Sequence, residues 1–186
     1  MWAWPFVIFL CTGINGAFLV TKGKRRKDIR KLGSGTGGAR NAGRIGGKSA
    51  FIWTVIIDAV KTILPLLVAI STGVSTLILA AMVVAAVAGH NWSIWLKGRG
   101  GKGVVVYLAC ALVLELPGLL LLGLIALGVK WLPVPFSKSM LITMSVPIVS
   151  SFVRGQGVVG IGLLLGYALV IYAHLQHRHK NKEEHL

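Results

Sequence analysis

Apolar runs alternate with short basic or glycine-rich segments along the whole of this sequence. The chain is 55% hydrophobic with a mean hydropathy of +0.77, and only 13% of its residues are charged. Ordinary soluble domains carry about 25% charged residues, so this chain is too apolar to be one. Only helices and closed barrels satisfy their backbone hydrogen bonds in lipid, and these runs lack barrel alternation. The pattern predicts an all-α, polytopic integral membrane bundle.

The apolar runs predict seven short membrane crossings in one domain that covers residues 1–186. A lone helix needs about 20 residues to cross about 30 Å of hydrocarbon, and several of these runs are shorter. Five crossings, with the four short runs after residue 103 joined into two, is therefore the alternative. The seven predicted crossings are Trp4–Val20, Ala50–Ile70, Leu77–Ala88, Val104–Leu114, Leu116–Val129, Met140–Phe152 and Val158–Ala173.

The distribution of charge favours seven crossings. The 20 Lys and Arg against 5 Asp and Glu give a formal charge of +15, and cationic loops tend to stay in the cytoplasm. With seven crossings every basic residue except Lys61 and Arg154 lies in a cytoplasmic loop or tail. With five, Arg154 would lie in mid-membrane, where a cation costs about 2.5–3.5 kcal/mol. We expect the N-terminus outside and the C-terminus in the cytoplasm, and membrane topology explains the charge without nucleic acid.

The segment 33–48, GSGTGGARNAGRIGGK, is polar and glycine-rich between two apolar runs, and we expect a flexible loop there. Two nucleotide-binding motifs are excluded. The G-x-G-x-x-G match at 33–38 follows basic residues instead of a strand, and Ala42 stands where a P-loop needs glycine. Consecutive glycines do let backbone N–H groups converge on an anion, and Arg44 and Lys48 add charge. The alternative is a basic loop with no ligand.

A second glycine-rich segment, 98–103 (GRGGKG), directly precedes an apolar run. If that run is a helix, its N-terminus adds a positive partial charge and unpaired N–H groups to the same chemistry. Two such segments on one face of the membrane predict binding of two anionic groups. The alternative is a basic loop that Trp92 and Trp95 anchor among the lipid headgroups.

Several other polar residues allow a functional and a structural interpretation. His90 has the chemistry of an acid, a base or a phosphate donor, but a lone histidine at the end of a crossing also serves as a structural hydrogen-bonding group. Asp58 and Lys61 are three apart, which predicts an intramembrane ion pair with a structural role. The histidines at 174, 177 and 179 have no correctly spaced carboxylate or thiol beside them, so we predict a basic tail and no metal site.

In its two glycine-rich segments and its tail, the sequence resembles the PlsY-type bacterial acyl-phosphate:glycerol-3-phosphate acyltransferases. The first motif of that family is Gly-Ser-Gly-Asn-Pro-Gly-Ala-Thr-Asn followed by Arg. This sequence differs from it at Thr36, Gly37 and Arg40. Matches to it are Gly33, Ser34, Gly35, Gly38, Ala39, Asn41 and Arg44. Matches to the second motif, Gly-His-x-Phe-Pro and a later Lys-x-x-Gly-Gly-Lys-Gly-Val, are Gly89, His90, Lys97, Gly100, Gly101, Lys102, Gly103 and Val104. The third motif, His-Arg-x-Asn-Ile, has a looser counterpart at His177, Arg178 and Asn181.

The resemblance implies transfer of a fatty acyl group from acyl phosphate to the 1-hydroxyl of glycerol 3-phosphate, which yields lysophosphatidic acid and phosphate. It implies catalytic roles for Ser34, Arg44, Lys102 and His177. It also implies substrate-phosphate contacts by Gly33, Gly35, Gly38, Asn41, His90, Gly100, Gly101, Gly103 and Asn181. The acyl chain is expected to enter between helices from the lipid. No metal, nucleotide, acyl-CoA or obligate protein partner is expected.

The expected location is the bacterial inner membrane, with the active site facing the cytoplasm. Two alternatives stay open at this stage. A small transporter or channel for an organic anion would also suit short helices and an intramembrane Asp58–Lys61 pair. A relative with altered or lost activity would suit the departures at Thr36 and Gly37.

Overall fold

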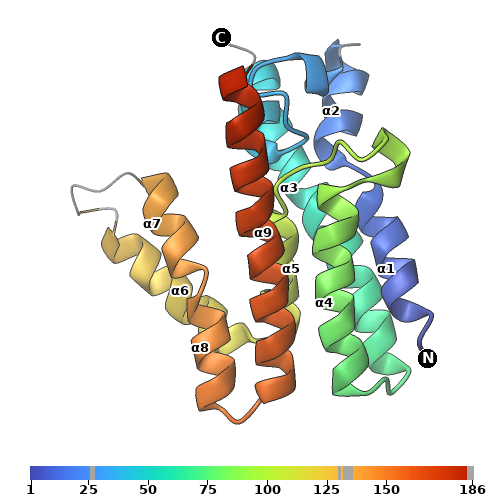
Figure 1. Ribbon diagram of the computed structural model, residues 1–186, viewed down its shortest axis with the longest axis vertical. Helices are drawn as coiled ribbons and strands as arrows, with labels where there is room; N and C mark the ends of the chain where they lie inside the picture. Colours follow the sequence, from blue (N-terminus) through green and yellow to red (C-terminus); the bar gives the residue numbers. More distant parts are fainter. Residues whose placement is uncertain (26–27, 130, 132–135, 184–186) are drawn as a thin grey trace.

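The structure is a computed structural model that describes residues 1–25, 28–129, 131 and 136–183. Every regular element in these residues is helical (Figure 1), which confirms the predicted all-α class. The α-helices are α1 (Trp4–Gly13), α2 (Gly16–Arg25), α3 (Ala39–Ser71), α4 (Thr76–Asn91), α5 (Val104–Leu114), α6 (Leu116–Val129), α7 (Phe136–Thr143), α8 (Val146–Val153) and α9 (Gly157–Glu183). Two 3₁₀ turns, η1 (Ile29–Lys31) and η2 (Ile94–Leu96), lie in the connections.

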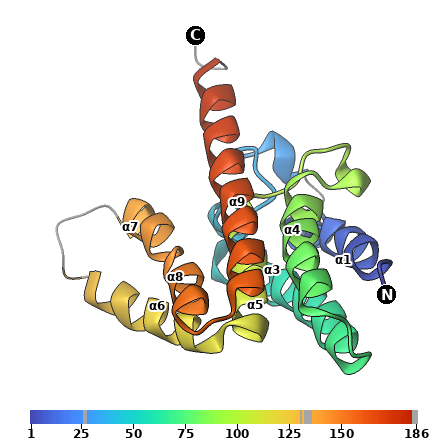
Figure 2. The same ribbon diagram turned by 60° about the horizontal axis from the view of Figure 1, so that its bottom comes forward.

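The helices run back and forth between two ends of the molecule. Four stretches are long and apolar enough to cross a membrane: Trp4–Gly23, Ala39–Ser71, Thr76–Leu96 and Gly157–His177. Shorter apolar stretches cover Val104–Leu114, Leu116–Val129 and Ser139–Val153. The chain reverses between α5 and α6 and again between α8 and α9 (Figures 1 and 2), so the runs that the five-crossing alternative would join are separate passes. The arrangement agrees with seven passes.

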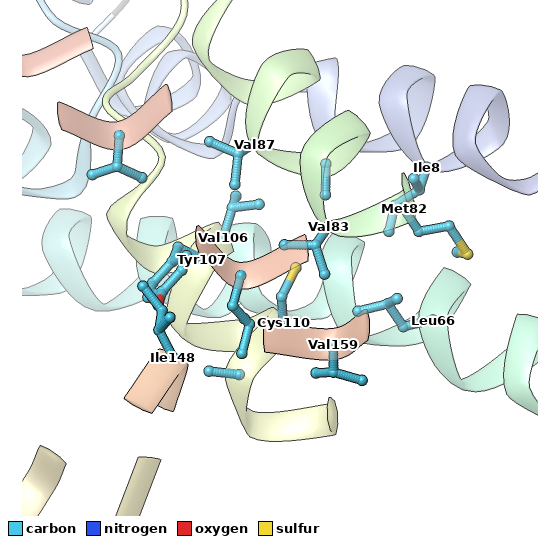
Figure 3. Close-up of a cluster of buried hydrophobic side chains, with 14 of the residues drawn as sticks. Ile8, Leu66, Met82, Val83, Val87, Val106, Tyr107, Cys110, Ile148 and Val159 are labelled. Carbon is cyan, nitrogen blue, oxygen red and sulfur yellow. The ribbon is translucent and has the colours of Figure 1, made fainter. Parts of the chain in front are cut away.

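The core lies where α4 packs between α1 and α9 (Figure 3). Met82, Val83 and Tyr107 are fully buried there. Small residues let the backbones of α4 and α9 approach closely, because a methyl group added at Gly162 would lie 2.7 Å from Ala80 Cα. Leucines such as Leu124 remain exposed on the outside of the bundle, as expected for a surface that faces lipid chains.

The first predicted crossing, Trp4–Val20, is not one continuous helix. The backbone leaves the helical conformation at Ile14, where ψ is 112°, and α2 starts at Gly16. Asn15 caps α2, since its Oδ1 accepts a hydrogen bond from Phe18 N at 2.8 Å. The predicted first crossing is present as a candidate span over Trp4–Gly23, and it is built from two helices because the apolar run contains a capping asparagine.

The predicted flexible loop at 33–48 is a loop only as far as Gly38. The helix α3 begins at Ala39 and continues to Ser71, with a kink at Gly47, whose φ and ψ are 77° and −175°. Alanine and arginine are strong helix formers, and they outweigh the glycines between 39 and 46. The arginines of this segment therefore lie on a helix, at fixed positions relative to one another.

Candidate active site

The loop before α3 is folded around the side chain of Asn41. This amide is 1% exposed. Its Nδ2 donates to the carbonyl oxygens of Leu32 and Thr36, each at 3.0 Å, and its Oδ1 accepts from Ser34 N at 3.0 Å. A methyl group at Gly33 would collide with Oδ1, and Gly33 also has a positive φ of 59°. Asn41 is thus bonded to the loop itself, and it shapes the backbone that carries Ser34.

Thr36, one of the departures from the family pattern, holds the Ser34 hydroxyl. The two side-chain oxygens are 3.0 Å apart, and Thr36 is 5% exposed. Gly37, a second departure, is equally engaged: its carbonyl accepts from Asn15 Nδ2 at 2.8 Å, and its N–H donates to Gly100 O at 3.0 Å. Both departures therefore take part in the architecture of the loop.

The two glycine-rich segments are joined directly to each other and to α4. Gly100 N donates to Asn91 O and Gly101 N donates to His90 O, each at 3.1 Å. A methyl group at Gly37 would lie 2.6 Å from Asn15 Nδ2 and 3.0 Å from Gly100 O. These glycines permit close backbone approach. The prediction that the Gly100 and Gly101 amides converge on an anion was wrong, because carbonyl groups already bind them.

Two helices begin directly after the glycine-rich loops. Gly38 is the N-cap of α3 and Gly103 the N-cap of α5, the latter with φ 75°. The first N–H groups of any helix lack intrahelical partners and carry positive partial charge. The predicted helix start after the second segment is confirmed, and a second one lies after the first.

A cavity of about 220 Å³ lies where the two segments meet the C-terminal part of α9. Three predicted clusters thus come together: the first loop with Ser34 and Gly35, the second with Gly100 and Gly101, and the tail with His177. The described lining residues are Arg30, Ser34, Gly35, Asn91, Trp92, Gly98, Arg99, Gly100, Gly101, Ala173, Gln176 and His177. Among the described residues the lining contains cations and no carboxylate, which suits an anionic ligand.

Lys102 lies two residues before α5, within the electrostatic influence of Arg40 and Arg44. Partial burial lowers the pKa of Lys102, and repulsion by the two guanidinium groups lowers it further. A bound anion would relieve both effects, since it restores a favourable partner for the charged ammonium. Arg44 itself lines a second, more open cavity of about 560 Å³ together with Arg40, Gly43, Lys48, Phe51 and Ile52.

The predicted intramembrane ion pair is present and is bonded to the break between α1 and α2. Lys61 Nζ lies 2.7 Å from Asp58 Oδ1, and both side chains are at least nine-tenths buried. Lys61 donates to Ile14 O at 2.5 Å, and Asp58 accepts from Gly16 N at 3.2 Å. The predicted ion pair is thus confirmed, and it satisfies one backbone group on each side of the break, as a structural role requires.

His90 belongs to this network and lies in the lining of neither cavity. Its Nδ1 is 3.1 Å from Lys61 Nζ, and the residue is 3% exposed. Its carbonyl holds Gly101, as described above, and a methyl group at Gly101 would collide with the imidazole. His90 thus supports the second glycine-rich segment from behind, and direct contact with substrate stays a prediction.

Three residues that the sequence did not single out tie the loops to the bundle. Asn15 caps α2 and also donates to Gly37 O. In the sequence, its position between two apolar stretches was the only sign of this role. Arg30 donates to Leu96 O at 3.0 Å and pairs with Asp28 at 2.6 Å; hydrogen bonds from Arg30 lower the pKa of Asp28. Ser93 donates to Gly13 O at 2.6 Å, a contact 80 residues apart that no local pattern marks.

The end of the tail is described only in part. The backbone of Asn181 lies in α9, whereas its side chain and those of Arg178 and His179 lie outside the described residues. The predicted phosphate contact by Asn181 stays a prediction.

Comparison with known proteins agrees with the geometry. A sequence model of the family described as glycerol-3-phosphate acyltransferase matches residues 2–184. The chain belongs to the glycerol-3-phosphate acyltransferase family. A relative of that name in Endomicrobium trichonymphae is 33% identical over 90% of this chain and 85% of its own length. Another in Pelagibacter ubique is 32% identical over 95% of this chain and 92% of its own length.

Solved structures carry the same fold. The crystal structure of PlsY, an integral membrane glycerol 3-phosphate acyltransferase, in its glycerol 3-phosphate form superposes with a TM-score of 0.84 at 26% identity. The match covers 97% of this chain and 91% of that one. The lysophosphatidic acid form of PlsY superposes with a TM-score of 0.81 at 23% identity, with the same coverage. This acyltransferase is therefore a multi-pass integral membrane protein.

Proposed function

We propose that this acyltransferase moves a fatty acyl group from acyl phosphate to the 1-hydroxyl of glycerol 3-phosphate. The observation that carries the proposal is the cavity between both glycine-rich segments and α9, with its cationic lining beside Lys102. Glycerol 3-phosphate is the ligand named for the PlsY crystal structure, and lysophosphatidic acid is named for its second form. Membership of the family supports the same acceptor.

The proposed reaction balances without a cofactor. The 1-hydroxyl oxygen attacks the acyl carbonyl carbon and forms the ester bond, the bond between that carbon and the phosphate oxygen breaks, and inorganic phosphate leaves. The hydroxyl proton passes to a phosphate oxygen of the substrates. Because acyl phosphate is already activated, the protein has mainly to neutralise phosphate charge and hold the hydroxyl near the carbonyl. No metal, nucleotide or acyl-CoA takes part.

The roles of individual residues follow from their surroundings. Lys102 and Arg44 neutralise phosphate, since each charge-assisted hydrogen bond is worth about 1.5–3 kcal/mol. Ser34 orients the acceptor phosphate, and its contacts with Asn41 and Thr36 support this role because they fix the direction of its N–H and hydroxyl groups. His177 contacts substrate from α9. Asn41 and His90 act as positioning residues through the loops that they hold.

We propose that the cavity faces the cytoplasm of a bacterial inner membrane. The first loop, the second glycine-rich segment and the C-terminal part of α9 all lie at one end of the bundle (Figure 1), and Arg30 and Arg99 line the cavity there. Basic loops favour the cytoplasmic side. A transporter fits less well, because Asp58 and Lys61 are bonded to the backbone at 14 and 16 and offer no mid-membrane site.

The experiment is release of phosphate by the purified protein in detergent, with acyl phosphate and glycerol 3-phosphate. We expect Ser34→Ala/Lys102→Gln to lower the rate at least about 100-fold, from two lost substrate contacts. Lys31→Gln, an exposed cation outside the cavity lining, is the control and retains the rate. Equal rates in wild type and double variant would refute the proposal. Release of coenzyme A from acyl-CoA under the same conditions would refute the proposed donor.

A further inference from the structure

The kink in α3 creates a cavity in which the proposed reaction uses Arg44 and leaves Arg40, Lys48 and the apolar wall without a role. Gly47 turns the helix, so that a methyl group at Gly43 would lie only 3.1 Å from Phe51 Cβ. In a straight helix, residues eight apart are separated by about 12 Å along the axis. The two parts of α3 therefore fold toward each other at Gly47. The open cavity of about 560 Å³ described above lies in this angle.

Three cations and two apolar side chains line the angle. Arg40 and Arg44 come from the helix before Gly47, and Lys48 follows it directly; all three are exposed. Phe51 and Ile52, on the helix after the kink, are 41% and 52% exposed. No acidic residue is found in this lining within the part of the chain that the structure describes. We call this set, Arg40, Arg44, Lys48, Phe51 and Ile52, the cationic elbow.

We propose that the cationic elbow binds an anionic phospholipid of the surrounding bilayer, with its headgroup phosphate on Arg40 and Lys48 and an acyl chain along Phe51 and Ile52. Charge complementarity favours a phosphate, and the order of the residues favours a lipid: the cations lie at the end of a long apolar helix and the exposed apolar residues follow. Trp53 and Ile56 continue the exposed apolar surface along the same helix. Basic clusters at the cytoplasmic end of a crossing attract anionic headgroups.

The elbow differs from the cavity assigned to the reaction. It lies on the helical part of the first glycine-rich segment, after Gly38, and its described lining contains no residue of the second segment, no serine and no part of α9. Arg44 is the residue that it shares with the proposed reaction. Arg40 departs from the family pattern at its position, and Lys48 lies beyond the first motif. The elbow is nonetheless electrostatically linked to Lys102 through Arg40 and Arg44. A bound lipid phosphate would weaken the repulsion that these arginines exert on Lys102, while lipid binding itself does not depend on the proposed reaction.

The test is native mass spectrometry of the purified protein in neutral detergent, with phosphatidylglycerol or phosphatidylcholine of the same chains. We expect wild type to retain one phosphatidylglycerol in preference to phosphatidylcholine. Arg40→Gln/Lys48→Gln removes two cations and should lower retention about 10- to 30-fold. Arg40→Lys/Lys48→Arg keeps the charge and should keep the lipid. Lys22→Gln/Lys31→Gln removes the same charge from exposed positions outside the elbow and should change retention little.

Three results would overturn the proposal. Equal retention in wild type and Arg40→Gln/Lys48→Gln would show that the elbow holds no lipid. An equal loss in Lys22→Gln/Lys31→Gln would show that only net charge matters. A higher KM for acyl phosphate in Arg40→Gln/Lys48→Gln, with phosphatidylglycerol retention unchanged, would assign the elbow to the acyl donor. Circular dichroism checks that each variant keeps the helical content of wild type.

Discussion

Replacing Asp58 by asparagine removes one charge from the buried pair and should destabilise the whole bundle. Asparagine has nearly the same shape and still offers an oxygen to Gly16 N, 3.2 Å away in the native protein. Lys61, whose side chain is 8% exposed, would then lack its carboxylate partner at 2.7 Å. Loss of one member of a buried pair costs about 3–5 kcal/mol. For a chain of this size that corresponds to a fall in Tm of about 6–20 °C.

A double variant separates two explanations of the same loss. In many proteins a buried ion pair can be replaced by apolar residues without loss of stability. Here Asp58→Leu/Lys61→Met would also leave Gly16 N and Ile14 O without their side-chain partners. An unsatisfied buried backbone group costs about 1–3 kcal/mol. We therefore expect the double variant to stay destabilised by about 2–6 kcal/mol, because the pair serves the backbone at the helix break.

The assay is thermal unfolding in detergent, followed by circular dichroism at matched detergent and protein concentrations. Asp28→Asn is the control, since the Asp28–Arg30 pair is partly exposed and such pairs contribute about 0–1 kcal/mol. A Tm for Asp58→Asn within 2 °C or so of the Asp28→Asn value would refute the reasoning. Full recovery of the wild-type Tm in Asp58→Leu/Lys61→Met would refute the backbone role.

Three further predictions concern the loops and the cations. Asn41→Leu leaves Ser34 N and the carbonyls of Leu32 and Thr36 without their amide partner, so kcat for phosphate release should fall at least about 10-fold; an unchanged kcat would show that Ser34 does not depend on this loop shape. Gly47→Ala places a Cβ on a residue with φ 77°, which costs about 1–3 kcal/mol. Phosphatidylglycerol retention and Tm should therefore both fall. Retention at the wild-type level would contradict the role of the kink. The pKa of Lys102 is lowered, so its charge and the affinity for glycerol 3-phosphate should be lost as pH rises through a value below the pKa of an ordinary lysine. Arg40→Gln removes a repelling charge and should move this loss to higher pH in a profile of KM against pH. Coincident profiles of wild type and Arg40→Gln would contradict the role of Lys102 in binding phosphate.

The sequence was sufficient for the fold class and for the residues that gather at one end of the bundle. Apolar runs separated by basic segments report directly on membrane passes, because hydrophobicity and charge act residue by residue. Ser34, Gly100 and His177 line one cavity as the motifs predicted. The spacing of Asp58 and Lys61 also predicted their pairing, because residues three apart lie on the same face of a helix.

The sequence was insufficient where a contact joins distant segments. The glycines at 100 and 101 were interpreted as anion binders, yet together with Gly37 they allow two loops and α4 to touch. That role depends on which backbone lies opposite, which no local pattern contains. Asn15 is a second example: its cap for α2 is local, but its bond to Gly37 O spans 22 residues. The helical start of α3 was missed because glycines outweighed alanine and arginine in the interpretation of 33–48.

The break between α1 and α2 has a consequence for how the chain enters the bilayer. A continuous helix satisfies its own backbone and can insert as soon as it is synthesised. The first pass of this protein cannot, because Ile14 O and Gly16 N find their partners on Lys61 and Asp58, more than 40 residues later. The N-terminal pass and α3 are in this sense one insertion unit. A fragment that ends before residue 58 should lie at the membrane surface or insert poorly, and completion of the first pass should wait for the second.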